Sequence, residues 1–498
     1  MATLNACHVV REREPVLRII MEWIARAAAG TSLEKTKERE REKKRRGAPS
    51  QESIYRAAHS PAQRAWQRRV MASLPLLGPG TPDEASVRSA RNVATALLAA
   101  SLMGTGVLSM ARACSLAGIV PFVLLSAIAA LAAHVTAVFL AKASTSSSST
   151  IPALCRDAFG PRMEWFACVV IVLQQIGACT GYVVVIGDTF APLLEYWLKT
   201  SHLHKYEVRI TLMALIVLPV SLIRNLSGLR FTSAISVTVI CIFCLTVVAN
   251  GLVVLADQDE RRESLMPEHV HLRGPYWGPR DTGALRSLGL IVFAYFMHQN
   301  VLAVFSTLRK TTGDVDVFAQ ACGRAVSVVC CASIAVGLAG YASFLSETAP
   351  DLLTNFLVKG TYISSAFNVV RALYGTGLLL AFPMMLWEAR ANTFKLVSRG
   401  EGEQEMSYSV HVVLTVALIA LTTLIGCLVS DLGTVFGLIG STCAPLLAYV
   451  FPAVLYLKSG EARKDEREKT AIGIAVLGGV FICLGVAVWA CDVAGVWE

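Results

Sequence analysis

Residues 101–113 read SLMGTGVLSMARA and lie within residues 91–118, an apolar segment long enough to cross a lipid bilayer. Two features oppose a simple membrane helix. Gly104 and Gly106 flank Thr105 and weaken a helix, and Arg112 carries a charge that hydrocarbon resists. Either the small residues let a neighbouring helix approach closely, or the helix is interrupted so that backbone amides are free for a ligand. Both interpretations fit this stretch alone.

The composition indicates an all-α integral membrane protein. The chain has 498 residues, of which 54% are hydrophobic and only 16% charged, and the apolar residues come in blocks of about 20. The blocks are continuously apolar and do not alternate with period two, so they predict helices and not barrel strands. Eleven spans are predicted, near residues 91–113, 119–141, 164–190, 208–223, 232–256, 286–305, 321–345, 363–387, 410–429, 434–457 and 470–491.

The first 89 residues have a different composition. Residues 34–46, EKTKEREREKKRR, form a mixed-charge run with no apolar face, which is typical of a solvated, disordered segment. We therefore predict a cytosolic, largely disordered, basic region over residues 1–89 and a membrane domain over residues 90–495.

The distribution of Lys and Arg predicts the topology. With the N-terminus in the cytosol, the inner loops hold 15 basic residues and the outer loops 7, and the N-terminal region adds 17 to the inner side. An odd number of spans then places the C-terminus on the external or luminal side. The net charge of +9 reflects this topology and does not indicate nucleic-acid binding.

A second polar stretch lies in the sixth predicted span. The sequence FAYFMHQN, residues 293–300, holds Tyr295, His298, Gln299 and Asn300 at membrane depth. Facing lipid would be costly for these side chains, so they should face the bundle interior, either as an interhelical hydrogen-bond cluster or as a binding site. No Gly or Pro marks a break here. If the helices form inverted repeats, however, residues 296–298 are the counterpart of residues 104–106 five spans earlier.

Other polar positions have simpler explanations. Pro383 lies inside the eighth span and predicts a kink, while Glu388 and Arg390 at its cytosolic end read as interfacial anchors. Asp188 lies near the outer end of the third span. The CxxC spacing of Cys241 and Cys244 falls inside an apolar span, and neither a metal site nor a bound cofactor is predicted.

Five motifs in order resemble the amino acid/auxin permease family, most closely its sodium-coupled neutral amino acid transporters and related vacuolar transporters. SLMGTGVLSMARACSLAG is similar to the first-helix pattern of that family, and FAYFMHQNVLAVFSTL, residues 293–308, is similar to its sixth-helix pattern. LPVSLIRNLSGLRFTSAIS (218–236), GYASFLSETAPDLL (340–353) and the spacing from Pro383 to Arg390 also agree.

The resemblance implies a LeuT-type fold, in which helices 1–5 and 6–10 form inverted repeats and an eleventh helix follows. It also implies an amino acid substrate held between helices 1 and 6, in a multi-pass protein of the plasma membrane or the vacuolar or lysosomal membrane. Carried over to this chain, Gly104, Thr105 and Gly106 would bind the carboxylate through backbone amides. Tyr295 and His298 would line the amino-group or side-chain end of the substrate.

Three departures from the family pattern concern coupling and gating. Sodium-coupled relatives carry Asn and Thr where this chain has Ala100 and Ala381, and an alanine offers sodium only its carbonyl oxygen. Proton coupling, or no coupling, is therefore expected in place of sodium coupling. Arg112 stands where relatives usually place an aromatic residue. The Arg112 side chain either extends to the outer interface or acts as a gating partner for Asp188 or an anionic substrate. Asn300 is a further gating candidate.

Two function classes follow. The first is a secondary amino acid transporter, with the lipid bilayer, an amino acid and in one version a proton as its partners. The second is an amino-acid-sensing receptor on the same scaffold that signals through its N-terminal region. An enzyme is not expected, because His298 has no second His or Asp at its depth to act with it.

Overall fold

A computed structural model of the chain describes residues 84–145, 150–199, 203–223, 230–256, 274–278, 282–312, 314–356, 362–398, 406–429, 432–464 and 466–494. The chain divides into two compact units, Met1–Ala57 and Ala58–Glu498. The first unit lies entirely outside the described residues, and with it most of the region predicted to be disordered.

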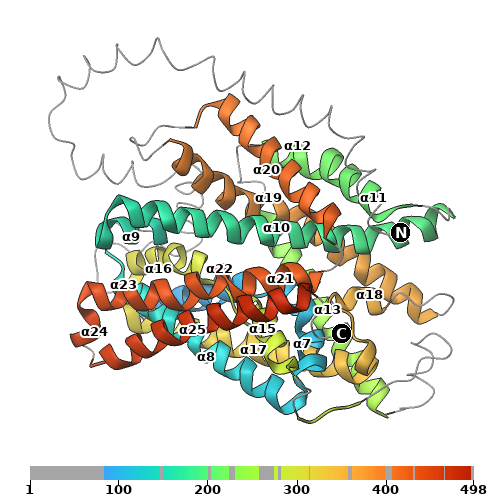
Figure 1. The fold of residues 1–498 in the computed structure, drawn as a ribbon, viewed down its shortest axis with the longest axis horizontal. Helices are drawn as coiled ribbons and strands as arrows, with labels where there is room; N and C mark the ends of the chain where they lie inside the picture. Colours follow the sequence, from blue (N-terminus) through green and yellow to red (C-terminus); the bar gives the residue numbers. More distant parts are fainter. Residues whose placement is uncertain are drawn as a thin grey trace. The chain divides into compact units, whose positions relative to one another are not determined.

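The described part of the second unit contains helices and no strands (Figure 1). Its first half comprises α6 (Glu84–Leu102), η1 (Thr105–Ser109), α7 (Met110–Ala117), α8 (Ile119–Ala143), α9 (Ile151–Phe159), α10 (Pro161–Leu198), α11 (Lys205–Leu212), η2 (Met213–Val217), α12 (Leu218–Leu222) and α13 (Arg230–Ala256). Its second half comprises α15 (Gly283–Ala294), α16 (His298–Thr312), α17 (Val315–Phe344), η4 (Leu345–Glu347), α18 (Leu352–Asn355), α19 (Tyr362–Val397), α20 (Tyr408–Leu428), α21 (Leu432–Ser441), α22 (Cys443–Pro445), η5 (Leu446–Val450), α23 (Phe451–Ser459), α24 (Glu461–Lys464) and α25 (Glu468–Val493).

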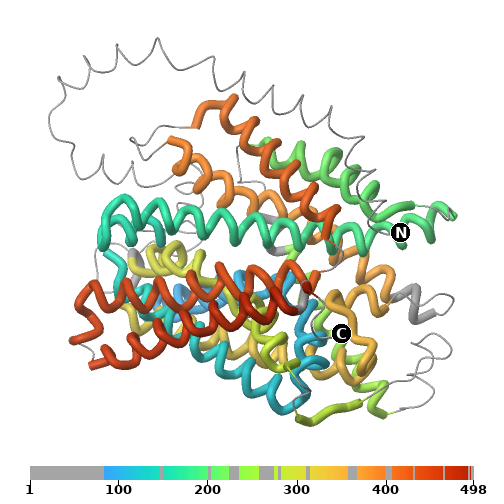
Figure 2. Tube along the Cα trace, viewed as in Figure 1, coloured from blue at the N-terminus to red at the C-terminus, as the bar shows by residue number. Residues whose placement is uncertain are grey.

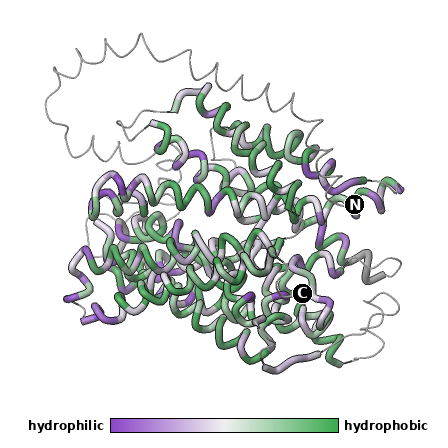
Figure 3. Tube along the Cα trace, viewed as in Figure 1, coloured by the Kyte–Doolittle hydropathy of each residue, from purple (hydrophilic) through white to green (hydrophobic). Residues whose placement is uncertain are grey.

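Most of the predicted spans are present. Nine helical segments within the described ranges are long and apolar enough to cross a membrane, and the bent pair Glu84–Leu102 and Thr105–Ala117 makes a tenth. The remaining prediction, residues 208–223, corresponds to α11, η2 and α12, which follow one another without a gap but are not among these candidate spans. Figure 3 shows the hydrophobic character of the helices along most of their length, as burial in lipid and in the bundle requires.

The first and sixth spans are both interrupted. The first bends by 51° between Leu102 and Thr105. The sixth consists of α15 and α16, with residues 295–297 between them outside any helix. The break five spans after the first was expected from the inverted repeat, although no residue type marked it. By contrast, Pro383 causes no break, because α19 continues through it as one helix.

The helices of the bundle pack closely against one another, including those that contain the breaks. α10 contacts α19 extensively, and both run through the bundle (Figures 1 and 2). α6 packs against α16 and α17, and α15 packs against α7, α8 and α21. The ends of α7 and α15 near residues 117 and 283 lie together, since a Cβ on Gly283 would be 2.0 Å from the Leu116 carbonyl oxygen. This end, which the charge distribution predicts to be external or luminal, is called the outer end below.

Candidate functional site

The two helix breaks lie side by side. η1 packs against α15, and a Cβ added to Gly106 would be 2.6 Å from Cα of Ala294, the last residue of α15. Real Cβ atoms essentially never come so close, so only glycine fits at this position. Of the two interpretations of the first break, close packing of neighbouring helices is therefore the one that applies to Gly106.

Gly104 has different surroundings. Its backbone is extended, with φ −119° and ψ −158°, and a Cβ placed on it would have no atom within 4 Å. Open space therefore adjoins the backbone at the start of η1. The first amides of a helical segment lack intrahelical partners and carry its positive dipole end, and η1 continues directly into α7. This part of the break can accept an anion such as a carboxylate.

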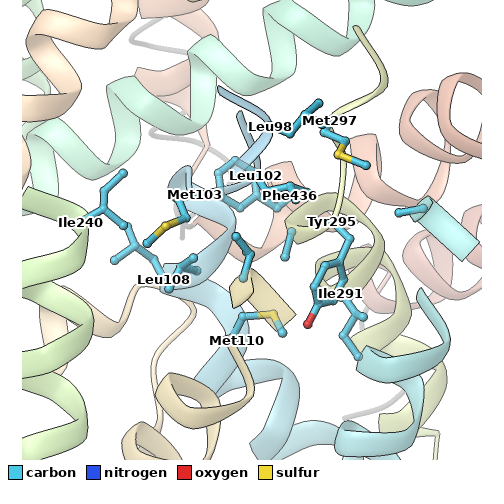
Figure 4. Packing of buried hydrophobic residues seen from close by; sticks show 14 of the residues in the cluster. Leu98, Leu102, Met103, Leu108, Met110, Ile240, Ile291, Tyr295, Met297 and Phe436 are labelled. Atoms are coloured by element: carbon cyan, nitrogen blue, oxygen red, sulfur yellow. The ribbon is translucent and has the colours of Figure 1, made fainter. Parts of the chain in front are cut away.

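Apolar side chains surround the backbone groups of both breaks (Figure 4). Leu102 ends α6, Met103 lies in the first break, Leu108 in η1 and Met297 in the sixth-span break, and all are buried. Backbone dipoles act more strongly in such low-dielectric surroundings than in water. The neighbourhood therefore suits a small polar ligand recognised mainly by the main chain.

The side chains of Tyr295 and His298 make their polar contacts with other helices. The Tyr295 hydroxyl donates to Cys330 Sγ in α17 at 3.6 Å, and His298 Nε2 lies 2.9 Å from Thr136 Oγ1 in α8. Because the Thr136 hydroxyl also donates to the Ala132 carbonyl, at 2.7 Å, His298 Nε2 is best assigned as a donor to Thr136. The structure places both residues at the break, but their polar atoms contact α17 and α8 and not residues 104–106.

Asn300 links α16 to α6. These are the halves of the sixth and first spans that run from the breaks towards the predicted cytosolic end. Asn300 Nδ2 donates to Ser101 Oγ at 2.6 Å, so α16 is hydrogen-bonded to α6 directly beside the first break. A polar contact between two helices that border a binding site is well placed to respond when they move apart.

Asp188 and Arg112 are not paired with each other. The Asp188 carboxylate lies 2.9 Å from Lys205 Nζ and 3.1 Å from Arg209 Nη2, whereas Arg112 Nη1 donates to the Thr348 carbonyl oxygen at 3.2 Å. Arg112 also lines a cavity of about 340 Å³ at the outer end. The proposed contact between Arg112 and Asp188 is therefore not formed in this structure. Asp188 instead forms ion pairs with Lys205 and Arg209 of α11.

Several buried charges were not anticipated from the sequence. Arg371 and Asp351 are 0% and 3% exposed, and Arg209 is 4% exposed. Arg390 is not an interfacial anchor, because it is buried and donates to Thr415 Oγ1 at 2.8 Å and to the Ser221 carbonyl. Arg371 lies inside a predicted span, where a charge marks a functional position by default, and that signal would have identified it.

Comparisons with known proteins identify the family of the chain. The family model described as "Transmembrane amino acid transporter protein" matches residues 88–497. Vacuolar amino acid transporter 2 of Saccharomyces cerevisiae is 26% identical over 63% of this chain and 64% of its own, so the match spans a little under two thirds of that relative. Amino acid transporter AVT6C of Arabidopsis thaliana is 26% identical over 76% of this chain and 88% of its own. A bovine relative, putative sodium-coupled neutral amino acid transporter 11, is 24% identical over 77% and 80%.

Solved structures identify the fold. The crystal structure of the Eremococcus coleocola manganese transporter in complex with an aromatic bis-isothiourea compound superposes with a TM-score of 0.51. The match covers 85% of this chain and 90% of the other at 15% identity. The fold is therefore of the LeuT type, as expected.

Proposed function

Because this chain belongs to the transmembrane amino acid transporter family, we propose that it moves amino acids across a membrane by alternating access. The observation that carries the proposal is the juxtaposition of the two helix breaks, with open space at Gly104 and close packing at Gly106. Interrupted helices at membrane depth are tolerated only where they line a cavity or are buried in protein, and transporters of this fold bind substrate there.

The substrate carboxylate would bind the amides of Thr105 and Gly106, and that of Gly104 once its hydrogen bond to the Leu102 carbonyl oxygen, 2.9 Å long here, is released. A zwitterion also needs groups of the opposite sign for its ammonium, and the carbonyl ends of α6 and α15 at the breaks provide them. Tyr295 and His298 would border the amino-group or side-chain end through their backbone and ring edges. Asn300 would act as a gate through Ser101, and Arg112 and Asp188 would act as gates at the outer end.

Coupling would use protons or no ion. The reason is chemical: sodium requires several oxygen ligands, and Ala100 and Ala381 supply no side-chain oxygen at the two positions where sodium-coupled relatives supply one. The membrane would be the plasma membrane or a vacuolar or lysosomal membrane, and the name of the yeast relative favours the second option.

The test is an uptake assay in proteoliposomes that contain the full chain. The twenty amino acids compete with a labelled one, in sodium and in choline buffer, with and without a pH gradient. We expect a subset to be transported, and we expect no loss of flux when choline replaces sodium. Specific binding without flux in any buffer would contradict transport and favour the receptor function, while strict dependence on sodium would contradict the coupling proposal alone.

A further inference from the structure

A short segment between α17 and α19 covers the outer half of the first broken helix. This outer segment, residues 345–356, contains η4 and α18. Arg112 of α7 donates to its Thr348 carbonyl, and α18 packs against η1 and α10. Leu352 is fully buried, and a Cβ on Gly340 would be 3.0 Å from its Cδ2 and 2.7 Å from Ala111 Cβ. The outer segment thus packs against η1 and α7, the part of the first broken helix that follows the break.

Asp351 holds this segment in shape and is itself buried. Its Oδ1 accepts a hydrogen bond from the Leu353 amide at 2.9 Å and so caps α18. Its Oδ2 is also buried but has no hydrogen-bond partner among the described residues. A carboxylate oxygen left without a donor in such surroundings makes the ionised form unfavourable.

The groups that act electrostatically on Asp351 have mixed charges. Arg371 of α19 is fully buried and donates through Nη2 to the Asp188 carbonyl at 3.2 Å, while its Nε and Nη1 have no partner in the described part of the chain. No ion pair at contact distance joins Arg371 to Asp351 there, although the two charges lie near enough to attract each other. Asp188 of α10 repels the Asp351 carboxylate, and Lys205 of α11 attracts it. Tyr374 of α19 also lies within electrostatic range.

Burial is the largest of these effects. It raises the pKa of Asp351 to about 7, and repulsion by Asp188 adds to the rise. The Leu353 amide, Arg371 and Lys205 oppose it without cancelling it. An aspartate in water has a pKa of about 3.9. The proton therefore binds more tightly when the outer segment is packed down than when it lifts into water.

We propose that Asp351 is a proton-binding site and that its protonation holds the outer segment closed over the first broken helix. The inference depends on the proposed transport function only in that the first broken helix borders a substrate site. Opening of the segment should increase as the pH rises from about 4 to about 7 and should level off above 7. One proton limits this change to about tenfold per pH unit.

The test measures how often the outer segment lifts. Leu353 is 1% exposed, so a cysteine in the Leu353→Cys chain reacts with a membrane-impermeant maleimide only when α18 moves away. Labelling is measured on the full chain in proteoliposomes between pH 5.5 and 8.5. Labelling of the chain without Leu353→Cys is subtracted, because native cysteines are also present. The matched control combines Leu353→Cys with Asp351→Asn, since asparagine keeps the helix cap and carries no charge.

The ratio of labelling rates, native Asp351 over Asp351→Asn, removes the intrinsic pH dependence of the thiol reaction. We expect the ratio to rise several-fold between pH 5.5 and 7 and then to stay constant, and we expect the same with Asp351→Ser as the uncharged cap. A ratio that does not change with pH would overturn the proposal, and so would protection of the cysteine at every pH in both chains. The readout needs no transport, so a chain that fails to transport still tests this proposal separately.

Discussion

At the scale of single residues, the two glycines of the first break have separate roles. Gly106 has no room for a side chain because Ala294 lies against it, whereas Gly104 adjoins open space. Loss of uptake in a Gly106 variant would therefore follow from disturbed packing alone. Gly104 is the position at which substrate binding can be tested without that ambiguity.

We predict that Gly104→Val leaves the folded protein abundant in the membrane and lowers uptake roughly tenfold or more. The extended backbone of Gly104 accepts valine, but the new methyl groups would occupy the space next to the first amides of η1. A tenfold loss corresponds to about 1.4 kcal/mol. Abundance is measured by size-exclusion chromatography and uptake in proteoliposomes.

The matched control for this experiment is Gly479→Val. Gly479 lies in α25, and a Cβ there also meets no atom within 4 Å. Normal uptake in this control is expected. Normal uptake in Gly104→Val as well would mean that the break does not hold the substrate.

At the scale of elements, the hydrogen bond between Asn300 and Ser101 joins α16 to α6 beside the breaks. We predict that Asn300→Ala and Ser101→Ala each favour separation of these helices by about threefold, since such bonds in membrane proteins average about 0.6 kcal/mol. The reporter is an Ala94→Cys cysteine in α6, at a position that is 3% exposed, and its labelling rate from the cytosolic side is measured. The double variant should show no further increase, because both changes remove the same bond. Multiplicative effects would indicate that the two residues act independently.

The hydrophobic pattern and the length of the apolar segments predicted the helices better than they predicted the breaks within them. The first break could be read from its glycines, but residues 295–297 are Tyr, Phe and Met, which carry no local signal for a break. That interruption coincides with a tertiary contact, because α15 ends where η1 packs against it. Pro383 is the converse case: it is a helix breaker by type, yet α19 passes through it as one helix.

The partners of buried charges were the least predictable part. The chain positions of Asp188 and Arg371 are 183 residues apart, and nothing local indicates that the guanidinium of one meets the backbone of the other. The sequence could mark such residues as unusual at membrane depth but could not pair them. For the same reason the sequence offered Asp188 only as one possible partner of Arg112, whose guanidinium instead binds the outer segment.

At the scale of the whole molecule, we propose that one site between two broken helices is exposed alternately to the two sides of the membrane. A carrier of this kind exchanges substrate across the membrane faster than it moves net substrate. A channel or a receptor on the same scaffold does not. The exchange can be measured without knowing the coupling ion, and the absence of sodium should not prevent it.

The most direct test is counterflow in proteoliposomes that hold the full chain. Vesicles are loaded with a high concentration of unlabelled substrate and diluted into choline buffer that contains a trace of the same amino acid in labelled form. We expect labelled amino acid to accumulate transiently above its external concentration, and we expect Gly104→Val to abolish this overshoot. Equilibration without an overshoot, or no entry of label at all, would contradict alternating access through this site.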